Sequence, residues 1–267
     1  MKTAVSFTNK TIVITGATSG IGRAISLRLA KRSNRLILIG RNQEALLELK
    51  TAIEQLKSTC TIIQADLADA TQVEAAIQRI NASISQLDVL INNVGVSQRG
   101  LAMSTALAVD QYIMNLNYFS IIQLTKGLYP LLQAAQQPRI IVLSSMSGKF
   151  GFHFRSAYAA SKHALHGFFE SMQVELMHTP LRITLVCPGR VKTGISLKAL
   201  TQNGEPHNKM DEGQSNGIAV EVCVTKLIQA AEAGKFEIHI TQNEHWLWMI
   251  KKVSTLLFLK IASKIKV

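Results

Sequence analysis

A tyrosine and a lysine, Tyr158 and Lys162, lie four residues apart in a segment whose pattern predicts a helix. Residues at positions i and i+4 project from one helical face, so the ammonium of Lys162 can lie beside the phenol of Tyr158 and favour its anion. A phenol with an ordinary pKa of about 10 is otherwise a poor proton donor or acceptor at neutral pH. Ser145 precedes Tyr158 by 13 residues. These side chains predict a site for proton transfer.

A glycine-rich turn stands far upstream, where Gly16, Gly20 and Gly22 are spaced G-x-x-x-G-x-G. Glycines at a strand-to-helix turn let the backbone approach a pyrophosphate closely, and the N-terminus of the following helix favours an anion. Such turns also occur without a ligand. In combination with Tyr158 and Lys162, this turn predicts a dinucleotide-binding site.

Short apolar runs alternate with longer helical patterns along the whole chain. We expect an α/β fold: a single-domain, Rossmann-type, doubly wound parallel sheet of about seven strands with helices on both faces. The domain spans residues 1–243, and a basic tail spans 244–267. The predicted strands are 11–15, 35–40, 61–65, 87–91, 139–144, 182–187 and 236–240, and the predicted helices are 20–33, 42–58, 69–83, 106–132, 156–178 and 220–233.

Four polar or glycine-rich segments follow predicted strands. The glycine turn follows the first strand, and residues 92–95 (Asn-Asn-Val-Gly) follow the fourth. Ser144 and Ser145 end the fifth, and residues 188–193 follow the sixth. Because the carboxyl ends of parallel strands meet at one sheet edge, we expect one ligand cleft there. We expect residues 195–216 to form a mobile loop that covers it.

In order and spacing, these motifs resemble the short-chain dehydrogenase/reductase family across residues ~10 to ~240. The resemblance implies that Tyr158 is the general acid/base, that Lys162 binds the nicotinamide ribose and lowers the Tyr158 pKa, and that Ser145 orients a carbonyl. It also implies that Asn117 holds a water of a proton relay. Ser144 and Asn115 remain alternatives to Ser145 and Asn117. The residues expected to bind the cofactor are Gly16, Thr18, Ser19, Gly20, Ile21, Gly22, Arg41, Asp66, Leu67, Asn93, Gly95, Tyr158, Lys162, Pro188, Gly189, Val191 and Thr193.

The charge after the second predicted strand favours NADP over NAD. An NAD site usually places an acid there to bind the ribose hydroxyls. Here Gly40 is followed by Arg41 and Asn42, and the first carboxylate, Glu44, falls early in the next helix. Arg41 is placed to contact a 2′-phosphate. The alternative is that Arg41 is only solvated.

The composition excludes several classes of protein. The chain has 267 residues and a net charge of +12, but its lysines and arginines form no block typical of nucleic-acid binders. Cys60, Cys187 and Cys223 are widely spaced, form no metal-ligand motif, and are expected to be buried and reduced. No metal is expected. Met1 to Lys10 lack the apolar core of a secretory signal, so we expect the protein to be cytoplasmic.

The tail from His245 combines Trp246 and Trp248 with five lysines, which interrupt its apolar run. This pattern predicts an amphipathic C-terminal helix lying in a lipid headgroup layer, since a spanning helix needs a longer apolar run. The alternatives are a dimer contact or packing over the substrate entrance. The tail and the body resemble the family branch that acts on steroid or long-chain lipid carbonyls.

We therefore expect an NADP-dependent oxidoreductase that reduces a hydrophobic ketone or aldehyde, and the family resemblance implies a homo-oligomer. Alternatives are a 3-oxoacyl reductase, an alcohol dehydrogenase, or a weakly catalytic nucleotide-binding scaffold or redox sensor. Near the predicted site, an apolar substrate pocket is expected from Met146, Phe150, Phe152, His153, Phe154 and Leu197.

Overall fold

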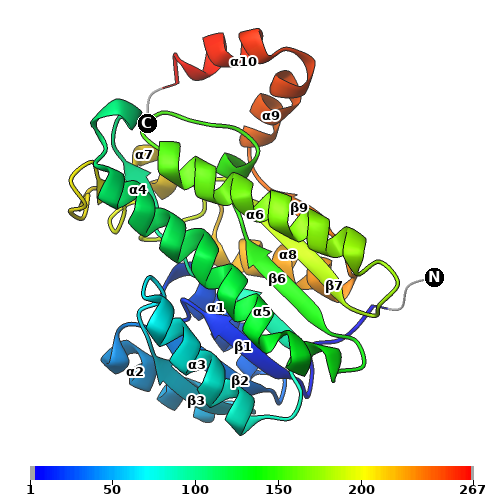
Figure 1. Cartoon of the computed structure of the whole chain (residues 1–267). Coiled ribbons are helices and arrows are strands. Elements are labelled where there is room, and N and C mark those ends of the chain that lie inside the picture. The colour runs from blue at the N-terminus through cyan, green and yellow to red at the C-terminus, as the bar shows by residue number, and fades with distance from the viewer. Residues whose placement is uncertain (1–3, 266–267) are drawn as a thin grey trace.

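A seven-stranded parallel sheet forms the centre of the computed structural model, which describes residues 4–265 (Figure 1). The strand order is β3-β2-β1-β4-β6-β7-β9. The strands are β1 (Thr11–Thr15), β2 (Arg35–Gly40), β3 (Thr59–Gln64), β4 (Val89–Asn92), β6 (Arg139–Leu143), β7 (Arg182–Pro188) and β9 (Glu237–Ile240). The single doubly wound α/β domain expected from the sequence is confirmed.

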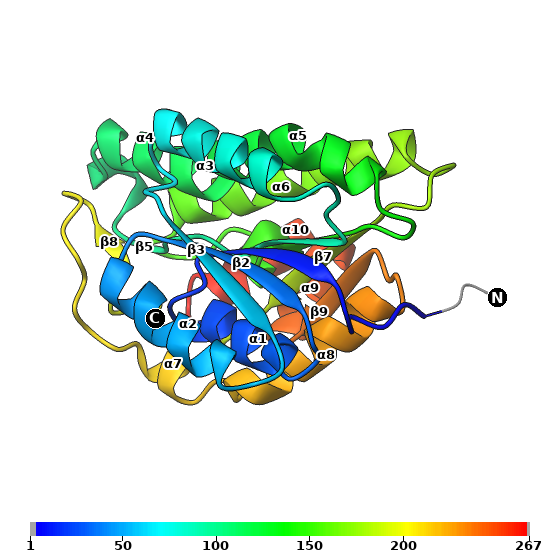
Figure 2. The ribbon, with the colours of Figure 1, turned by 90° about the horizontal axis from the view of Figure 1, so that it is seen from below.

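Helices cover both faces of the sheet (Figure 2). One layer contains α1 (Gly20–Ala30), α2 (Gln43–Glu54) and α8 (Val220–Glu232). The other contains α3 (Ala70–Ser83), α4 (Leu107–Met114), α5 (Ser120–Gln133) and α6 (Ser156–Glu175). Successive strand residues point to opposite layers: Ile12 and Ile14 join one core cluster, and Val13 joins the other. Burial on both faces explains why the strands lack polar alternation.

The ligand-binding edge follows from the strand order. The chain runs outward from β1 through β2 to β3, then returns to β4 on the other side of β1 and continues through β6, β7 and β9. Ile14 of β1 pairs with Ile91 of β4 at this reversal. Open α/β sheets bind ligands at the carboxyl ends of the strands beside such a switch point.

The helix expected over 106–132 is interrupted. Its central residues form a π-helical turn, η2 (Asn115–Phe119), between α4 and α5. Such single π turns widen a helix and reposition its side chains, and they frequently mark functional sites. A uniform apolar pattern gave no sign of this turn.

Residues 195–216, which were expected to form a mobile loop over the cleft, include short regular elements. They contain β8 (Leu200–Thr201), which pairs with β5 (Gln98–Arg99) in a small second sheet, and α7 (Glu212–Ser215). The short 3-10 helices η1 (Ala102–Ser104) and η3 (Met146–Gly148) lie in other connections. Backbone pairing therefore ties the cover segment to the body of the protein.

The expected single C-terminal helix is two helices, α9 (Glu244–Val253) and α10 (Thr255–Ala262). Ser254 adopts an extended conformation between them, and its Oγ accepts a hydrogen bond from the backbone N–H of Leu257. This serine N-cap begins α10 and redirects the chain. Phe258 then packs against Phe150, with ring centroids 5.5 Å apart. No helix among the described residues is long and apolar enough to cross a bilayer.

Candidate active site

The glycine turn after β1 has the backbone that its glycines permit. Gly16 and Gly20 have φ values of 61° and 52°, in the left-handed region that glycine adopts without steric cost. A Cβ on Gly22 would lie 2.3 Å from the carbonyl oxygen of Gly16. Asn93 Nδ2 donates to the carbonyls of Thr15 and Gly16, both at 3.0 Å. The turn is therefore closely packed and braced from the end of β4.

The N-terminus of α1 faces this turn and can accept an anion. Ser19 occupies the N-cap position, but its side chain makes no capping hydrogen bond. The first N–H groups of a helix have no intrahelical partners, and they carry a partial positive charge. Asn42 contrasts with Ser19, because its side chain accepts a hydrogen bond from Ala45 N at the start of α2.

A cleft of about 350 Å³ joins the glycine turn to the ends of β4, β6 and β7. Its lining includes most of the side chains expected at a dinucleotide site: Gly16, Thr18, Ser19, Gly20, Ile21, Arg41, Leu67, Asn93, Gly95, Ser145, Tyr158, Lys162, Pro188, Gly189, Val191 and Thr193. Gly22, Asp66 and Asn117 do not line the cleft. Gly22 packs beneath the turn, and Asp66 Oδ2 lies 3.9 Å from Arg41 Nη1.

Tyr158 and Lys162 are both buried on the inner face of α6, with Lys162 Nζ 5.8 Å from the centroid of the Tyr158 ring. This geometry confirms that the two side chains share a helical face. Lys162 Nζ donates to the carbonyl of Leu143 at 2.7 Å, and burial lowers the pKa of Lys162 to about 8. The ammonium is thus anchored at the end of β6.

The two serines at the end of β6 have different surroundings. Ser145 lines the cleft, accepts a hydrogen bond from Ser147 N at 3.1 Å, and donates one to the Pro188 carbonyl at 3.5 Å. Ser144 is buried, and its Oγ lies 3.0 Å from His166 Nε2. Both serines line the cleft, but the Ser145 hydroxyl is the one that hydrogen-bonds to Tyr158, whereas the Ser144 hydroxyl contacts His166.

Asn117 lies in the π-helical turn and is fully buried, whereas the alternative Asn115 is exposed. Asn117 Oδ1 accepts a hydrogen bond from Val96 N at 2.9 Å, and Nδ2 donates to Ser161 Oγ at 3.1 Å. A Cβ on Gly95 would lie 3.2 Å from Asn117 Oδ1 and 3.4 Å from Lys162 Nζ. Asn117 thus lies directly behind the cleft wall, and its proposed water contact stays a prediction.

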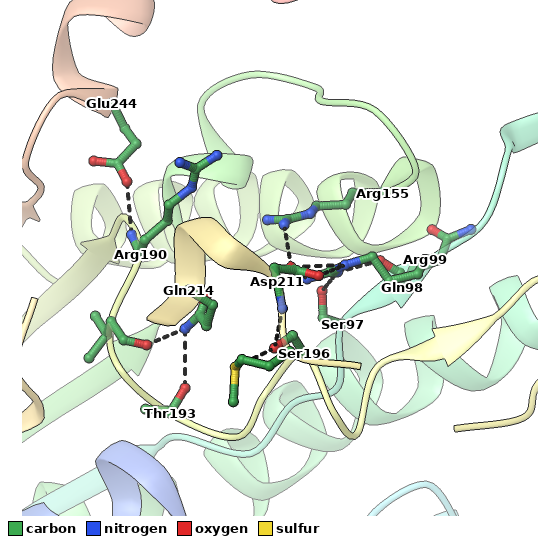
Figure 3. Close-up of polar contacts among 12 residues, drawn as sticks. Ser97, Gln98, Arg99, Arg155, Arg190, Thr193, Ser196, Asp211, Gln214 and Glu244 are labelled. Carbon is green, nitrogen blue, oxygen red and sulfur yellow. Dashed lines mark hydrogen bonds and ion pairs between the residues drawn. The ribbon is translucent and has the colours of Figure 1, made fainter. Parts of the chain in front are cut away.

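Two arginines supply positive charge near the Tyr158 phenol. Figure 3 shows how both of them, Arg99 and Arg155, approach Asp211. Arg99 Nε donates to Asp211 Oδ2 at 3.1 Å, and Arg155 Nη2 donates to the same oxygen at 3.3 Å. Two guanidiniums therefore share one carboxylate, which leaves a net positive charge. Burial raises the pKa of Tyr158 above its ordinary value, and the hydroxyl of Ser145 and the charges of Arg155 and Arg99 offset only part of this rise.

Sequence reasoning missed this arginine pair. Arg155 stands three residues before Tyr158, so its position alone could have indicated a role. Arg99 and Asp211 lie 112 residues apart, and Asp211 fell in the segment expected to be a loop. Burial raises the pKa of Asp211, but the hydrogen bonds and charges of Arg99 and Arg155 more than offset this and lower it.

A second cavity, of about 590 Å³, adjoins the cleft and shares Ser145, Arg155, Gly189 and Gln214 with it. Its apolar wall comes from segments far apart in the sequence: Met146, Phe150, Phe152, Trp246, Leu247 and Ile265. Of the side chains expected to line a substrate pocket, His153, Phe154 and Leu197 do not line this cavity, and all three are exposed. The packing of α9 over this cavity agrees with one of the alternatives considered for the tail, that it packs over the entrance to the site.

Glu244, the first residue of α9, connects that helix to the loop that follows β7. Its carboxylate accepts a hydrogen bond from Arg190 N at 2.9 Å (Figure 3). It accepts a second one from Gln242 N at 3.1 Å. Gln214 of α7 donates to the Val191 carbonyl and to Thr193 Oγ1. These contacts hold both covering segments against the 188–193 loop.

The family model for short chain dehydrogenases matches residues 10–204, most of the chain. The chain belongs to the short-chain dehydrogenase family. This is a family of nicotinamide-dependent oxidoreductases, and the match spans the glycine turn, Ser145, Tyr158 and Lys162. The resemblance inferred from the sequence motifs is thus confirmed.

Curated relatives of this short-chain dehydrogenase include animal proteins. Dehydrogenase/reductase SDR family member 7B of Bos taurus is 39% identical over 216 residues, which cover 78% of this chain and 66% of the relative. The dehydrogenase/reductase SDR family protein 7-like of Anopheles gambiae is 32% identical over 261 residues, which cover 91% of this chain and 82% of the relative. The chain thus spans about two thirds of the bovine relative's length.

Solved structures of similar fold support the architecture. A short-chain dehydrogenase/reductase from Burkholderia phymatum in complex with NAD has a TM-score of 0.83 at 21% identity, covering 94% of this chain and 95% of that one. A short-chain dehydrogenase from Sphingobium yanoikuyae in complex with NADPH has a TM-score of 0.78 at 21% identity, covering 96% of each chain. At this identity the likeness establishes the fold alone.

The three cysteines are free and buried, as expected. Among the described residues, His166, Cys187 and Glu237 form one group with metal-ligand spacing. However, Lys149 Nζ lies 2.5 Å and His239 Nε2 2.6 Å from the Glu237 carboxylate. Burial would raise the pKa of Glu237, but these two hydrogen bonds lower it to about 2. We therefore interpret the group as part of a partly buried ion-pair network.

Proposed function

We propose that this chain is an NADP-dependent oxidoreductase that reduces a hydrophobic ketone or aldehyde. The observation that carries the proposal is the position of Ser145 at the junction between the glycine-lined cleft and the largely apolar cavity. Tyr158 and Lys162 line the cleft beside this junction. A cofactor in one space and a carbonyl compound in the other would meet beside the phenol.

The residues of the cleft fit a dinucleotide. Gly16 and Gly20 keep side chains away from the pyrophosphate position, and the uncapped start of α1 offers N–H donors to it. Lys162 and the loop of Pro188 to Thr193 would hold the nicotinamide half. Thr18, Leu67 and Arg41 would hold the adenosine half.

Arg41 supports the choice of NADP. No carboxylate ends β2, and Arg41 lines the cleft with an exposed guanidinium, which donates to the Tyr112 hydroxyl at 3.0 Å. A guanidinium in this position suits the 2′-phosphate of NADP. Asp66 lies 3.9 Å away, so the arginine is held near the adenosine side of the cleft.

The mechanism follows from the surroundings of Tyr158. When bound, the reduced nicotinamide supplies the hydride that adds to the carbonyl carbon. Ser145 donates a hydrogen bond to the carbonyl oxygen, and Tyr158 transfers its phenolic proton to that oxygen, which yields the alcohol and a phenolate. The positive charges of Arg155 and Arg99 stabilise the phenolate until solvent returns a proton.

The cavity wall supports a substrate with a large apolar part. Phe150, Phe152, Trp246 and Leu247 offer hydrophobic surface, and burial of apolar area contributes roughly 25 cal/mol per Å². Arg155 and Arg190 lie at the polar end of the same cavity.

We also propose that the protein forms a homo-oligomer through α5 and α6. The exposed apolar residues Phe119, Val174 and Met177 lie on or beside these helices.

Initial rates of nicotinamide oxidation test the proposal. The panel contains a steroid ketone, a long-chain aliphatic ketone, a 3-oxoacyl thioester and a small polar ketone, each with NADPH or NADH. We expect turnover of the large apolar ketones, with kcat/KM about tenfold or more higher for NADPH than for NADH. Tight NADPH binding without turnover of any carbonyl would contradict a reductase and favour a nucleotide-binding scaffold.

A further inference from the structure

The outer face of the α9–α10 hairpin carries apolar side chains that the fold leaves uncovered. Its inner face packs against the body of the protein, because Phe258 and Ala262 are buried in one cluster with Phe150. On the outside, Val253 is 88% exposed, Leu256 73% and Trp246 68%. Leu257, Leu259 and Met249 are also exposed. Single exposed apolar residues are ordinary, but a concentration of them in one hairpin marks an interaction surface.

The charge on this hairpin is mostly positive. Lys252, Lys260 and Lys264 are exposed, and Lys251 Nζ donates to the Lys149 carbonyl at 2.8 Å. Glu244 is the one acid between residues 244 and 265, and its carboxylate is occupied by two backbone N–H groups. Lysines rimming an apolar surface complement anionic lipid headgroups, because their stems lie along apolar surface while their ammonium groups reach the headgroups.

The hairpin also forms part of the cavity wall. Trp246 and Leu247 of α9, and Ile265 beyond α10, line the cavity that adjoins Ser145. Trp246 is at once a lining residue and largely exposed, so it lies at the outer rim of the cavity. Figure 1 shows α9 and α10 projecting at one end of the molecule, beyond the carboxyl edge of the sheet.

We propose that the outer face of α9 and α10 docks this protein on an anionic membrane surface. Because no helix among the described residues can cross a bilayer, the hairpin lies in the headgroup layer, with Val253 and Leu256 inserted and the lysines against the phosphates. The rim of the cavity at Trp246 then faces the lipid. The inference rests on the exposed hairpin and its charge, and it holds whether or not the proposed reductase activity is found.

Vesicle flotation of the full-length protein tests the docking. One set of vesicles contains phosphatidylcholine with about 30% phosphatidylglycerol, and the other contains phosphatidylcholine alone. We expect wild-type protein to float with the anionic vesicles and to be released by about 0.5 M NaCl. The double variant Val253→Ser/Leu256→Ser should lower the floated fraction about tenfold, as should Lys260→Glu/Lys264→Glu.

A matched control replaces the same residue types outside the hairpin. Leu47→Ser/Val222→Ser removes one exposed leucine on α2 and one exposed valine on α8, and it should float like wild type. Thermal unfolding confirms that each variant is folded, and the charge variant keeps the test valid if the serine variant does not fold. Absent flotation of the wild type, or equal flotation of the folded hairpin variants, would overturn the proposal. So would a fall in oligomer mass of the hairpin variants without vesicle binding, because the hairpin would then be a contact between copies of the chain.

Discussion

The glycine-lined cleft and the second, largely apolar cavity meet at Ser145, but they are built in different ways. Short connections directly after β1, β4, β6 and β7 form most of the cleft, so the hydrogen-bonded sheet sets their positions. The cavity is closed by α7 and α9, which lie outside the sheet and are held by side-chain contacts such as Glu244 to Arg190 N. We therefore expect the cleft to be the more rigid part of the site and the cavity to tolerate changes of sequence better.

The largest effect is expected in the cleft, from Gly22→Ala. The new Cβ would lie 2.3 Å from the carbonyl oxygen of Gly16 and 2.4 Å from Asn93 Nδ2. Because the Gly16 oxygen belongs to the backbone of the turn itself, relief requires movement of the whole turn. We expect a loss of about 1–3 kcal/mol in the free energy of unfolding and loss of NADPH binding. Calorimetric unfolding with and without NADPH measures both, and a full cofactor-induced rise in Tm would contradict the expectation.

A second substitution in the cleft, with a smaller expected effect, tests the preference for NADPH over NADH. Arg41→Ala removes the guanidinium proposed to contact the 2′-phosphate, so KM for NADPH should rise about tenfold while KM for NADH stays unchanged. Steady-state kinetics with both cofactors measures this difference. Arg41→Lys, which keeps the charge, is the control and should raise the KM for NADPH less than Arg41→Ala does. If both cofactors weaken equally, the arginine has only a structural role.

At the junction of the two regions, Arg155→Met should change the pH dependence of the reverse reaction. Oxidation of an alcohol requires the Tyr158 phenolate, and loss of a neighbouring positive charge raises the pKa of that phenol. The ascending limb of kcat/KM against pH should therefore move to higher pH. Arg155→Lys retains a positive charge and should move it less. An unchanged limb in the methionine variant would show that Arg155 does not act on the phenol.

The smallest effect is expected in the cavity, from Gly213→Ala. Here too the new Cβ would meet atoms closer than 3 Å, but they belong to the guanidinium of Arg190. The end of a flexible side chain can move, so the free energy of unfolding should change by less than about 1 kcal/mol. The KM of the carbonyl substrate should change more than that of NADPH. A destabilisation equal to that of Gly22→Ala would remove the contrast between the two regions.

The same contrast explains how much of the molecule was predictable from sequence. The strand limits of β1 and β2 match the structure at both ends, because uninterrupted apolar runs are the direct signature of a buried parallel strand. Most of the cleft lining followed from the residues after each strand. Local patterns contain no information on contacts between distant segments, so they missed Asp211 between Arg99 and Arg155.

Two further differences between the predicted and the observed helices have local causes in the sequence. Ser254 ends one helix and caps the next, which divides the expected C-terminal helix. The π-helical turn at Asn115–Phe119 interrupts a pattern whose apolar spacing continues through it. Lys162 was expected to lower the Tyr158 pKa, but this pKa is raised in the folded protein, because burial outweighs the opposing effects of the Ser145 hydroxyl and of Arg155 and Arg99.

The central claim is that the phenol of Tyr158 supplies the proton to a carbonyl oxygen held by Ser145. Turnover of Tyr158→Phe under saturating NADPH tests it most directly, because phenylalanine keeps the ring and its packing and removes only the hydroxyl. We expect kcat to fall about a hundredfold or more, with the Kd for NADPH and the Tm within the range of wild type. A folded, NADPH-binding variant that turns over within a few-fold of wild type would contradict the claim.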